Sequence, residues 1–410
     1  MKTVTSLLAA ALLAASTASG SPILSANALD RRAIPSDLSN LTVAAVRVPP
    51  VNWRLPILDF NFTGNAFDLN GTVDYGVELI GQAAAAGASV VAFPECWFPG
   101  YPKSSDDTEW RKTYLANYIE NSLVIDSPQW NQLLEAARNN SIYVGLGYTE
   151  RADDKIYMAQ ALIGPDGDVL IHRHKLRPSG GERTIFSDGT IDQLEVVSTP
   201  IGRISMVECW EHFHPSMTFP IQIQTPDLHI GPFPYQPYRN DTKARYWEVA
   251  DTNWGAVRTF SISTGAATIS TAVGGAMILS STGEILAEVD GETDFSSEPL
   301  IYASLNATAF ANVTYNTNGE QSWGTLKQIE SAVPAYIPRD NGTFINQVNN
   351  SIPDILAAVN VSVPADLTFA TNVTSAAAAA SPSPTSGAAL SFRLTTASLV
   401  ALGLGAVALA

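Results

Sequence analysis

Cysteine is nearly absent from this chain of 410 residues, which contains only Cys96 and Cys209. Basic residues are also few, since 23 Lys and Arg stand against 39 Asp and Glu and give a net charge of −16. No segment of the sequence supplies a cationic face. Nucleic acids and anionic lipid surfaces attract basic proteins, so we exclude both as partners.

The sequence also has no internal repeat of the length that builds solenoids or propellers. What it does have is a hydrophobic content of 46% with eight Trp, enough for a large core. Length alone allows one large domain or two.

The first 20 residues have the layout of a secretory signal peptide. Lys2 is the basic start, residues 7–15 are a run of Leu and Ala, and small residues follow up to Gly20. This order of charge, apolar run and small residues is typical of secretory signals. Arg31-Arg32 is a dibasic pair, so residues 21–39 are interpreted as a propeptide or linker.

The last residues have the layout of a signal for attachment of a glycosylphosphatidylinositol (GPI) lipid. Small residues at 386–388 precede a short spacer and an apolar end at 396–410. That apolar run is shorter than the roughly 20 residues that a membrane-spanning helix needs. We therefore expect residues 389–410 to be removed and the lipid to attach at Ser386 or Gly387. Residues 375–388 are rich in Ala, Ser and Pro and are interpreted as a flexible stalk.

Sequons for N-glycosylation are frequent and agree with a secretory route. Each has Asn, a residue other than Pro, and then Ser or Thr. The sequon asparagines are Asn40, Asn61, Asn70, Asn139, Asn240, Asn306, Asn312, Asn341, Asn349, Asn360 and Asn372. We expect a glycosylated protein on the outer face of the plasma membrane or in the cell wall, held by the lipid anchor. Residues 336–374 are expected to form a glycosylated extension.

Strand and helix patterns alternate along residues 40–335. Residues 41–48 are rich in β-branched and apolar residues, residues 74–86 have helical spacing, and residues 89–93 are again strand-like. A strand, a helix and a second strand in this order indicate an α/β fold. We predict further helices at 110–123, 130–138, 215–224 and 243–263, further strands at 142–148, 157–163, 168–172, 194–198, 203–207, 227–230, 274–279 and 284–290, a hairpin turn at 164–167 and a surface loop at 53–70.

Cys209 stands at the end of the run of residues 204–209, whose apolar residues predict a buried strand, and polar residues follow it. A thiol at a strand end beside polar groups is a candidate nucleophile. Taken alone, such a cysteine is more commonly a core residue. Two other runs decide the interpretation.

Glu95 and Lys175 each follow a hydrophobic strand as well. Glu95 ends the run Val90–Glu95, where burial would raise its pKa toward that of a base useful near neutral pH. Lys175 lies in the run His172–Pro178, where an ammonium group could stabilise a developing anion. Each residue alone also has a non-catalytic interpretation. Glu95 would then be an exposed carboxylate at a strand end, and Lys175 a solvated loop lysine.

Together these runs resemble the nitrilase, or carbon–nitrogen hydrolase, superfamily over residues 40–335. Val91–Glu95 with Pro99–Pro102 is similar to its glutamate motif, and His172–Pro178 with Glu182 to its lysine motif. Cys209-Trp210-Glu211-His212 resembles the cysteine motif of the nitrilase and cyanide hydratase branch.

The resemblance implies a four-layer αββα sandwich, a single catalytic domain of the α/β class, and no metal or organic cofactor. It also implies roles: Cys209 as nucleophile, Glu95 as general base, Lys175 as stabiliser of the tetrahedral intermediate, and Glu182 as a second, substrate-positioning carboxylate. Trp210 and His212 are expected to line the substrate pocket.

The expected reaction is hydrolysis of an organic nitrile to a carboxylic acid and ammonia through a thioimidate and an acyl-enzyme. A secreted amidase and a nitrile or cyanide hydratase stay open as alternatives, as does a non-catalytic surface protein that keeps the fold. The loops 97–110 and 231–240 are rich in aromatic residues and Pro, which favours an apolar or aromatic substrate. The resemblance also implies a homodimer or larger homo-oligomer.

Two residues next to the predicted site residues depart from the superfamily pattern, one a glutamate and one a cysteine. Glu208 directly precedes Cys209, and strand alternation predicts that its side chain faces away from the thiol. Cys96 directly follows Glu95, and a disulfide with Cys209 would abolish activity. The same alternation favours two free thiols. His229 is interpreted as a hydrogen-bonded core histidine.

Overall fold

The computed structural model describes residues 37–62, 66–308, 320–336 and 346–367. Two six-stranded sheets form the centre of the molecule, in the orders β12-β1-β2-β3-β4-β5 and β11-β10-β9-β8-β7-β6. The strands of the first sheet are β1 (Leu41–Val46), β2 (Val90–Ala92), β3 (Tyr143–Ala152), β4 (Lys155–Ile163), β5 (Val169–His174) and β12 (Leu300–Leu305). Those of the second are β6 (Val197–Thr199), β7 (Gly202–Met206), β8 (Leu228–Gln236), β9 (Ala267–Gly274), β10 (Ala276–Leu279) and β11 (Ile285–Val289).

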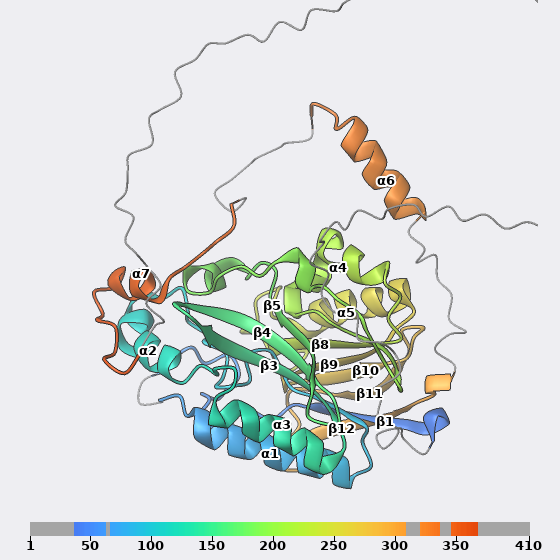
Figure 1. The fold of residues 1–410 in the computed structure, drawn as a ribbon, viewed down its shortest axis with the longest axis horizontal. Coiled ribbons are helices and arrows are strands. Elements are labelled where there is room, and N and C mark those ends of the chain that lie inside the picture. The colour runs from blue at the N-terminus through green and yellow to red at the C-terminus, as the bar shows by residue number, and fades with distance from the viewer. Residues whose placement is uncertain (1–36, 63–65, 309–319, 337–345, 368–410) are drawn as a thin grey trace, which may run out of the picture. The chain divides into compact units, whose positions relative to one another are not determined.

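Helices cover the outer faces of both sheets, as Figure 1 shows. The helices are α1 (Leu69–Ala85), α2 (Thr108–Glu120), α3 (Pro128–Asn140), α4 (Pro215–Gln222), α5 (Ala250–Thr264), α6 (Glu320–Ser331) and α7 (Ile352–Ala357). One core cluster lies between α1, α3 and the first sheet, and a second lies between the two sheets. A third joins the second sheet to α5. The predicted αββα sandwich is therefore confirmed.

Local sequence explains why α1 and α3 begin where they do. The side chain of Asp68 accepts a hydrogen bond from the backbone N–H of Gly71 at the start of α1. Ser127 caps α3 in the same way, and Pro128 occupies its first turn. Both are preferred helix starts, because the cap satisfies an otherwise unpaired backbone N–H and Pro lacks one.

The predicted strand–helix–strand unit and hairpin are both present. β1 and β2 are parallel and flank α1, and β4 and β5 are antiparallel around the turn at 164–167. Gly167 has φ +80°, a left-handed conformation that favours glycine in such turns. This hairpin matters for function, because it directs the end of β5 toward the site.

Several boundaries differ from the prediction. α5 begins at Ala250, later than predicted, because the Glu248 carboxylate accepts the backbone N–H of Arg245 and holds residues 245–248 in a turn. The 53–70 loop does not lie wholly on the surface, since Phe62 and Phe67 are buried against Trp110.

The predicted C-terminal extension also contributes to the core. Ile352, Ile355 and Leu356 of α7 are buried in the cluster that contains Trp110 and Leu115 of α2. Asn350 strengthens this contact, because its side-chain amide donates to the backbone oxygens of Arg183 and Phe186. Helix α7 therefore packs against the α/β core. The predicted stalk and both terminal signals lie outside the described residues.

Candidate active site

Four of the predicted site residues meet where strands of the two sheets end. Glu95 follows β2, Lys175 follows β5, and Glu182 lies in the short 3-10 helix η3 (Gly180–Thr184). Cys209 is the first residue of a second 3-10 helix, η5 (Cys209–Phe213), beyond the end of β7. Residues more than one hundred positions apart in the sequence thus form one cluster.

Lys175 is the centre of this cluster. Its Nζ donates to Oε1 of Glu95 at 2.6 Å and to Oε2 of Glu182 at 2.9 Å. The side chains of Lys175 and Glu95 are fully buried. The ordinary readings of a solvated loop lysine and an exposed carboxylate are therefore wrong, because each charge is withdrawn from water and paired.

Glu182 is held by two further donors. The hydroxyl of Tyr101 donates to its Oε1 at 3.0 Å, and the backbone N–H of Ser179 donates to its Oε2 at 2.6 Å. With Lys175 this makes three donors on one carboxylate, which fixes its position at the edge of the cavity. Tyr101 belongs to the Pro99–Pro102 run, but sequence reasoning gave it no role.

The electrostatics of the cluster suit proton transfer near neutral pH. Burial raises the pKa of Glu95 to about 7, and the positive charge of Lys175 opposes this rise. Burial alone would lower the pKa of Lys175, but Glu182 and Glu95 raise it well above its usual range. Lys175 therefore stays charged while Glu95 can exchange a proton.

Cys209 lies in an unusual backbone conformation, with φ +46°. Left-handed non-glycine residues cluster at functional sites, where the surrounding structure supports the strain. The thiol hydrogen-bonds to Glu95. Burial and the negative charge of Glu95 raise the pKa of Cys209 well above its usual value, so the thiol is protonated at rest.

Gly147 allows the Glu95 backbone to lie against β3. A Cβ at Gly147 would lie 2.2 Å from the backbone oxygen of Pro94 and 2.9 Å from Cα of Glu95. No side chain fits at such a distance, and the backbone oxygen of Gly147 also accepts the N–H of Trp97 at 2.8 Å. The sequence contains no signal that separates this glycine from its neighbours.

The prediction for Glu208 rested on strand alternation, and that premise is wrong. β7 ends at Met206, so the alternating pattern does not extend to Glu208. The carboxyl group is fully buried, and neither of its oxygens has a hydrogen-bond partner among the residues that the structure describes. Burial, and then the charge of Glu95, raise the pKa of Glu208 well above its usual value. Glu208 is therefore a neutral carboxylic acid next to the cluster of Glu95 and Lys175.

Glu211 behaves differently although it lies on the same turn. Its Oε1 accepts hydrogen bonds from Arg173 at 2.6 Å and from the backbone N–H of Leu176 at 2.8 Å, and its Oε2 accepts the N–H of Glu208. Burial is the largest effect and opposes ionisation of Glu211, but the charge and hydrogen bond of Arg173, together with the backbone N–H groups of Glu208 and Leu176, outweigh it and lower the pKa. The contact between Arg173 and Glu211 thus connects η5, which follows β7 of the second sheet, to β5 of the first sheet.

Trp210 lies on the wall of the cavity, and the substrate-binding role of Trp210 and His212 stays a prediction. His212 does not belong to the cavity wall; its Nδ1 bonds the backbone oxygen of Cys209 at 2.7 Å and its Nε2 lies 3.0 Å from Nε2 of His229. The tight turn of η5 directs the ring behind Cys209. His229 is fully buried and bonded to Ser205, which confirms it as a core histidine.

Both cysteines are free thiols, as predicted. Cys96 lies in the core cluster beside Tyr118 and Ile119. Burial raises its pKa well above the usual value. The negative charges of Glu95 and Glu208 add to this rise, so the environment disfavours the thiolate of Cys96.

A cavity of about 430 Å³ opens at Cys209 and Glu182. Most of its other wall residues are aromatic or charged. They include Phe60, Tyr101, Trp210, Phe233, Tyr235, Tyr246 and Trp247, with Lys103, Asp106, Arg245 and Glu248. Tyr235 donates its hydroxyl to Glu248 at 3.0 Å. Of the predicted aromatic loops, 97–110 and 231–240 both contribute, while residues 245–248 were not predicted.

Lys103 is the least expected member of this wall. It is mostly buried, lies 3.7 Å from the ring centroid of Trp53, and donates to the backbone oxygen of Arg54. Burial lowers the pKa of Lys103 to about 7, with Asp59 opposing the change.

The surface of the described residues agrees with the sequence reading of the sequons. All eight sequon asparagines that the structure describes are exposed, namely Asn40, Asn61, Asn70, Asn139, Asn240, Asn306, Asn349 and Asn360. Asn312, Asn341 and Asn372 lie outside the described residues. Among the described helices, none combines the length and apolar character needed to cross a membrane.

Comparison with known proteins gives the family. The sequence profile described as carbon-nitrogen hydrolase matches residues 42–310. An arylacetonitrilase of Aspergillus kawachii is 42% identical over 168 residues, which are 41% of this chain and 51% of that protein. A nitrilase of Pseudomonas syringae is 39% identical over 180 residues, covering 43% of this chain and 54% of the relative. A cyanide hydratase of Alternaria brassicicola is 37% identical over 180 residues, covering 43% and 50%. The chain thus spans about half the length of the curated relatives it matches.

Solved structures share the fold at much lower identity. A carbon–nitrogen hydrolase of Helicobacter pylori superposes with a TM-score of 0.51 at 15% identity, and the match covers 73% of this chain and 100% of that protein. An amidase of Nesterenkonia in complex with butyramide gives a TM-score of 0.51 at 15% identity, covering 71% and 99%. Because the family profile covers more than half of the chain, we conclude that the chain belongs to the carbon–nitrogen hydrolase family.

Proposed function

We propose that this enzyme is a nitrilase that converts an aromatic nitrile to its carboxylic acid and ammonia. The observation that carries the proposal is the placement of Cys209 and Glu182 on the wall of a cavity that seven aromatic side chains also line. An aryl ring is apolar and flat, so such walls bind it well. The relatives named arylacetonitrilase and nitrilase support the same substrate class.

The proposed first step uses the contact between Glu95 and the thiol. Glu95 takes the proton of Cys209, the thiolate adds to the nitrile carbon, and the Glu95 carboxyl group passes that proton to the nitrogen, which gives a thioimidate and restores the carboxylate. The ammonium group of Lys175 stabilises the negative charge that builds on the nitrogen, and the backbone N–H of Trp210 is a second donor for it. Glu182, fixed by Tyr101, orients the substrate.

The remaining steps release both products. A water molecule that Glu95 deprotonates adds to the thioimidate carbon, and the carboxyl group passes this proton, and then that of the new hydroxyl group, to the nitrogen, so that ammonia leaves and a thioester remains. A second water molecule hydrolyses the thioester, which yields the acid and restores the thiol. If the carbon–sulfur bond breaks after the first water, the product is an amide, and the enzyme is a hydratase.

The cavity size favours an organic nitrile over cyanide. A space of about 430 Å³ far exceeds what one hydrogen cyanide molecule occupies. Cyanide hydratase activity, suggested by relatives with that name, is therefore the second candidate. The amidase alternative has support only from the titles of proteins that share the fold.

A substrate panel tests the proposal directly. Phenylacetonitrile, benzonitrile, acetonitrile and cyanide are incubated with purified enzyme beside phenylacetamide, and ammonia, acid and amide are quantified. We expect acid and ammonia from the aryl nitriles, and none from the Cys209→Ala variant. Hydrolysis of the amide with untouched nitriles would make the enzyme an amidase, and turnover of cyanide alone would make it a cyanide hydratase. No turnover with a Cys209 that resists iodoacetamide would favour the non-catalytic alternative.

The substrate class can be tested separately through the cavity wall. Trp247 lines the cavity and is 39% exposed, while Trp323 is 49% exposed and lies outside that wall. Trp247→Ala is expected to raise KM for phenylacetonitrile more than for acetonitrile, with Trp323→Ala as the matched control. Equal changes for both nitriles would contradict ring recognition by Trp247.

We further propose that the enzyme follows the secretory route, carries N-glycans and is held at the cell surface by a lipid at Ser386 or Gly387, as a homodimer or larger assembly. The exposure of the eight described sequon asparagines supports the glycans. A mass shift after peptide N-glycosidase treatment and release of the protein from cells by a phosphatidylinositol-specific phospholipase would test this route.

A further inference from the structure

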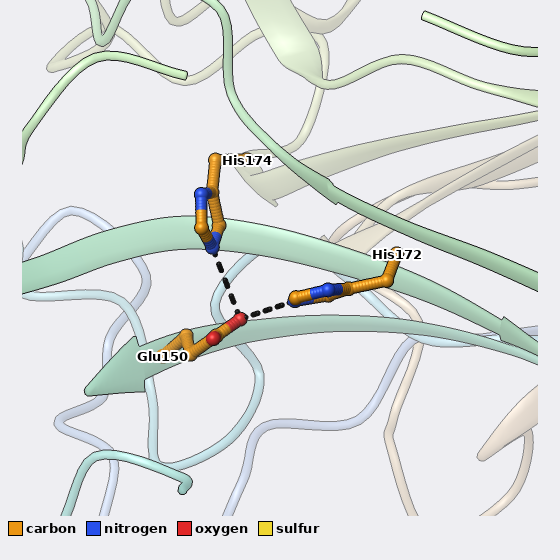
Figure 2. A group of neighbouring side chains, drawn as sticks. All are labelled: Glu150, His172 and His174. Atoms are coloured by element: carbon orange, nitrogen blue, oxygen red, sulfur yellow. Dashed lines mark hydrogen bonds and ion pairs between the residues drawn. The ribbon is translucent and has the colours of Figure 1, made fainter. Parts of the chain in front are cut away.

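A cluster of two histidines and one carboxylate lies outside the cavity, on the first sheet. Nε2 of His172 is 2.6 Å from Oε2 of Glu150, and Nε2 of His174 is 3.2 Å from the same oxygen. One ligand atom from each of the three residues lies within 4.8 Å of the other two. Figure 2 shows the three side chains pointing toward one another from two strands.

The sheet itself separates this cluster from the active site. Side chains alternate between the two faces of a strand, so His172 and His174 of β5 share one face. Arg173 and Lys175 point to the opposite face, where they meet Glu211 and Glu95. The histidines therefore take no part in the contacts of the catalytic cluster.

The strand between the two halves of the cluster carries small residues beside both histidines. β4 lies between β3 and β5, and it places Ala161 beside His172 and Ala159 beside His174. Both alanines carry only a methyl group. Glu150 of β3 is paired with Tyr157 of β4, so its side chain reaches diagonally across β4 to the histidines.

The three side chains are held by their own neighbours. The hydroxyl of Tyr148 donates to Oε2 of Glu150 at 3.3 Å. The ring of Tyr157 stacks on that of His174, with centroids 3.9 Å apart and an angle of 7° between the planes. Contacts of this kind orient metal ligands in proteins. Glu150 has a side chain that is 4% exposed, while that of His172 is 37% exposed and gives access from solvent.

We propose that Glu150, His172 and His174 form a zinc-binding site at the edge of the first sheet. Two imidazole nitrogens and one carboxylate oxygen are a donor set that zinc prefers, whereas magnesium and calcium prefer oxygen donors alone. Tetrahedral zinc bonds of 2.0–2.1 Å place neighbouring ligand atoms about 3.3 Å apart. The separations of 2.6 and 3.2 Å need only small side-chain shifts to meet that value. Water from the exposed side of His172 completes the coordination.

Such an ion would fasten the edge strand that leads to the active site. His174 is the last residue of β5, and Lys175 follows it directly. The ion would tie β5 to β3 across β4, so zinc raises the stability of the fold without entering the reaction. The proposal is independent of which nitrile or amide the enzyme hydrolyses.

Zinc binding to the full chain tests the proposal, with protein that carries no polyhistidine tag. The Cys209→Ala background removes the catalytic thiol as a competing ligand. Isothermal titration with zinc is expected to give about one tight site per chain. We expect that site to be lost in the His172→Ala/His174→Ala variant and kept in His214→Ala, whose histidine is exposed and lies outside the cluster.

Two further variants keep the test informative if the double variant fails to fold. Glu150→Gln retains the volume and a hydrogen-bond acceptor but loses the negative charge, and it should also lose zinc. Tyr148→Phe removes only the hydroxyl that orients Glu150, and we expect zinc affinity to fall about ten-fold. Zinc should raise Tm of the Cys209→Ala protein and leave that of Glu150→Gln unchanged. Absence of zinc binding, or full binding by the double variant or by Glu150→Gln, would overturn the proposal and leave a purely hydrogen-bonded cluster.

Discussion

Lys175 donates to Glu95 at 2.6 Å although the two residues lie 80 positions apart in the sequence, and both side chains are fully buried. The pair joins the end of β5 to the end of β2, and Glu182 extends it to η3. Two carboxylates thus share one ammonium group beside Cys209. The stability of the site and its chemistry depend on the same contacts.

Replacement of Lys175 by Met is expected to cost both activity and stability. It leaves two buried carboxylates without their cation, and removal of one partner of a buried pair typically costs about 3–5 kcal/mol. Urea unfolding should show this loss. Lys112→Met is the matched control, because Lys112 pairs with Glu109 on an exposed part of α2 and its loss should cost less than about 0.5 kcal/mol. Equal effects of the two changes would contradict the role given to burial.

The rate of Cys209 alkylation should depend on pH through Glu95. The pKa of Glu95 is raised by burial to about 7, so the group is protonated below that pH and ionised above it. Only the ionised carboxylate can take the thiol proton, so the rate with iodoacetamide is expected to rise as pH increases through about 7. Peptide mapping would separate Cys209 from Cys96. The inflection should disappear in Glu95→Gln, and its persistence there would assign it to another group.

Glu208 and Glu211 offer a matched pair of substitutions on one turn. Glu208 is kept neutral by burial, and Gln has nearly the same shape as a protonated carboxyl group. Glu208→Gln should therefore change stability by less than about 1 kcal/mol. Glu211→Gln removes the charge that Arg173 pairs with, and we expect a loss of about 2 kcal/mol. Thermal and urea unfolding of both variants would measure the difference, and the reverse order would show that Glu208 is ionised.

Gly147→Ala is expected to be severe, because the new methyl group would meet the backbone of Pro94 and Glu95. Backbone atoms cannot move aside as a flexible side chain does, so the cost should reach about 3 kcal/mol. The change should also lower kcat, since it displaces Glu95. Gly81→Ala on α1 is the control, since a Cβ there meets nothing within 4 Å and Ala favours the helix by about 0.5–1 kcal/mol. A Gly147→Ala protein with normal kcat would disprove the link between β3 and Glu95.

The sequence by itself determined the α/β class, most of the strands and helices, and the set Glu95, Lys175, Glu182 and Cys209. Hydrophobic periodicity and capping are local properties, and each of the four residues stands in a distinctive local run. Only the tertiary structure decided which residues surround them. Tyr101, Gly147 and the turn at 245–248 reach the site through contacts between elements far apart in the chain, which no local pattern records.

The same limit applies to the surroundings of Glu208 and His212, which no local pattern predicted. Strand alternation placed Glu208 on the far side, but β7 ends two residues earlier and a tight turn takes over. That turn also directs His212 behind Cys209 instead of into the cavity. The face to which a side chain points within a strand follows from local alternation. Where the strand ends and where the next turn leads depend on packing between the sheets. Arg173 and Glu211 make that packing contact across the two sheets.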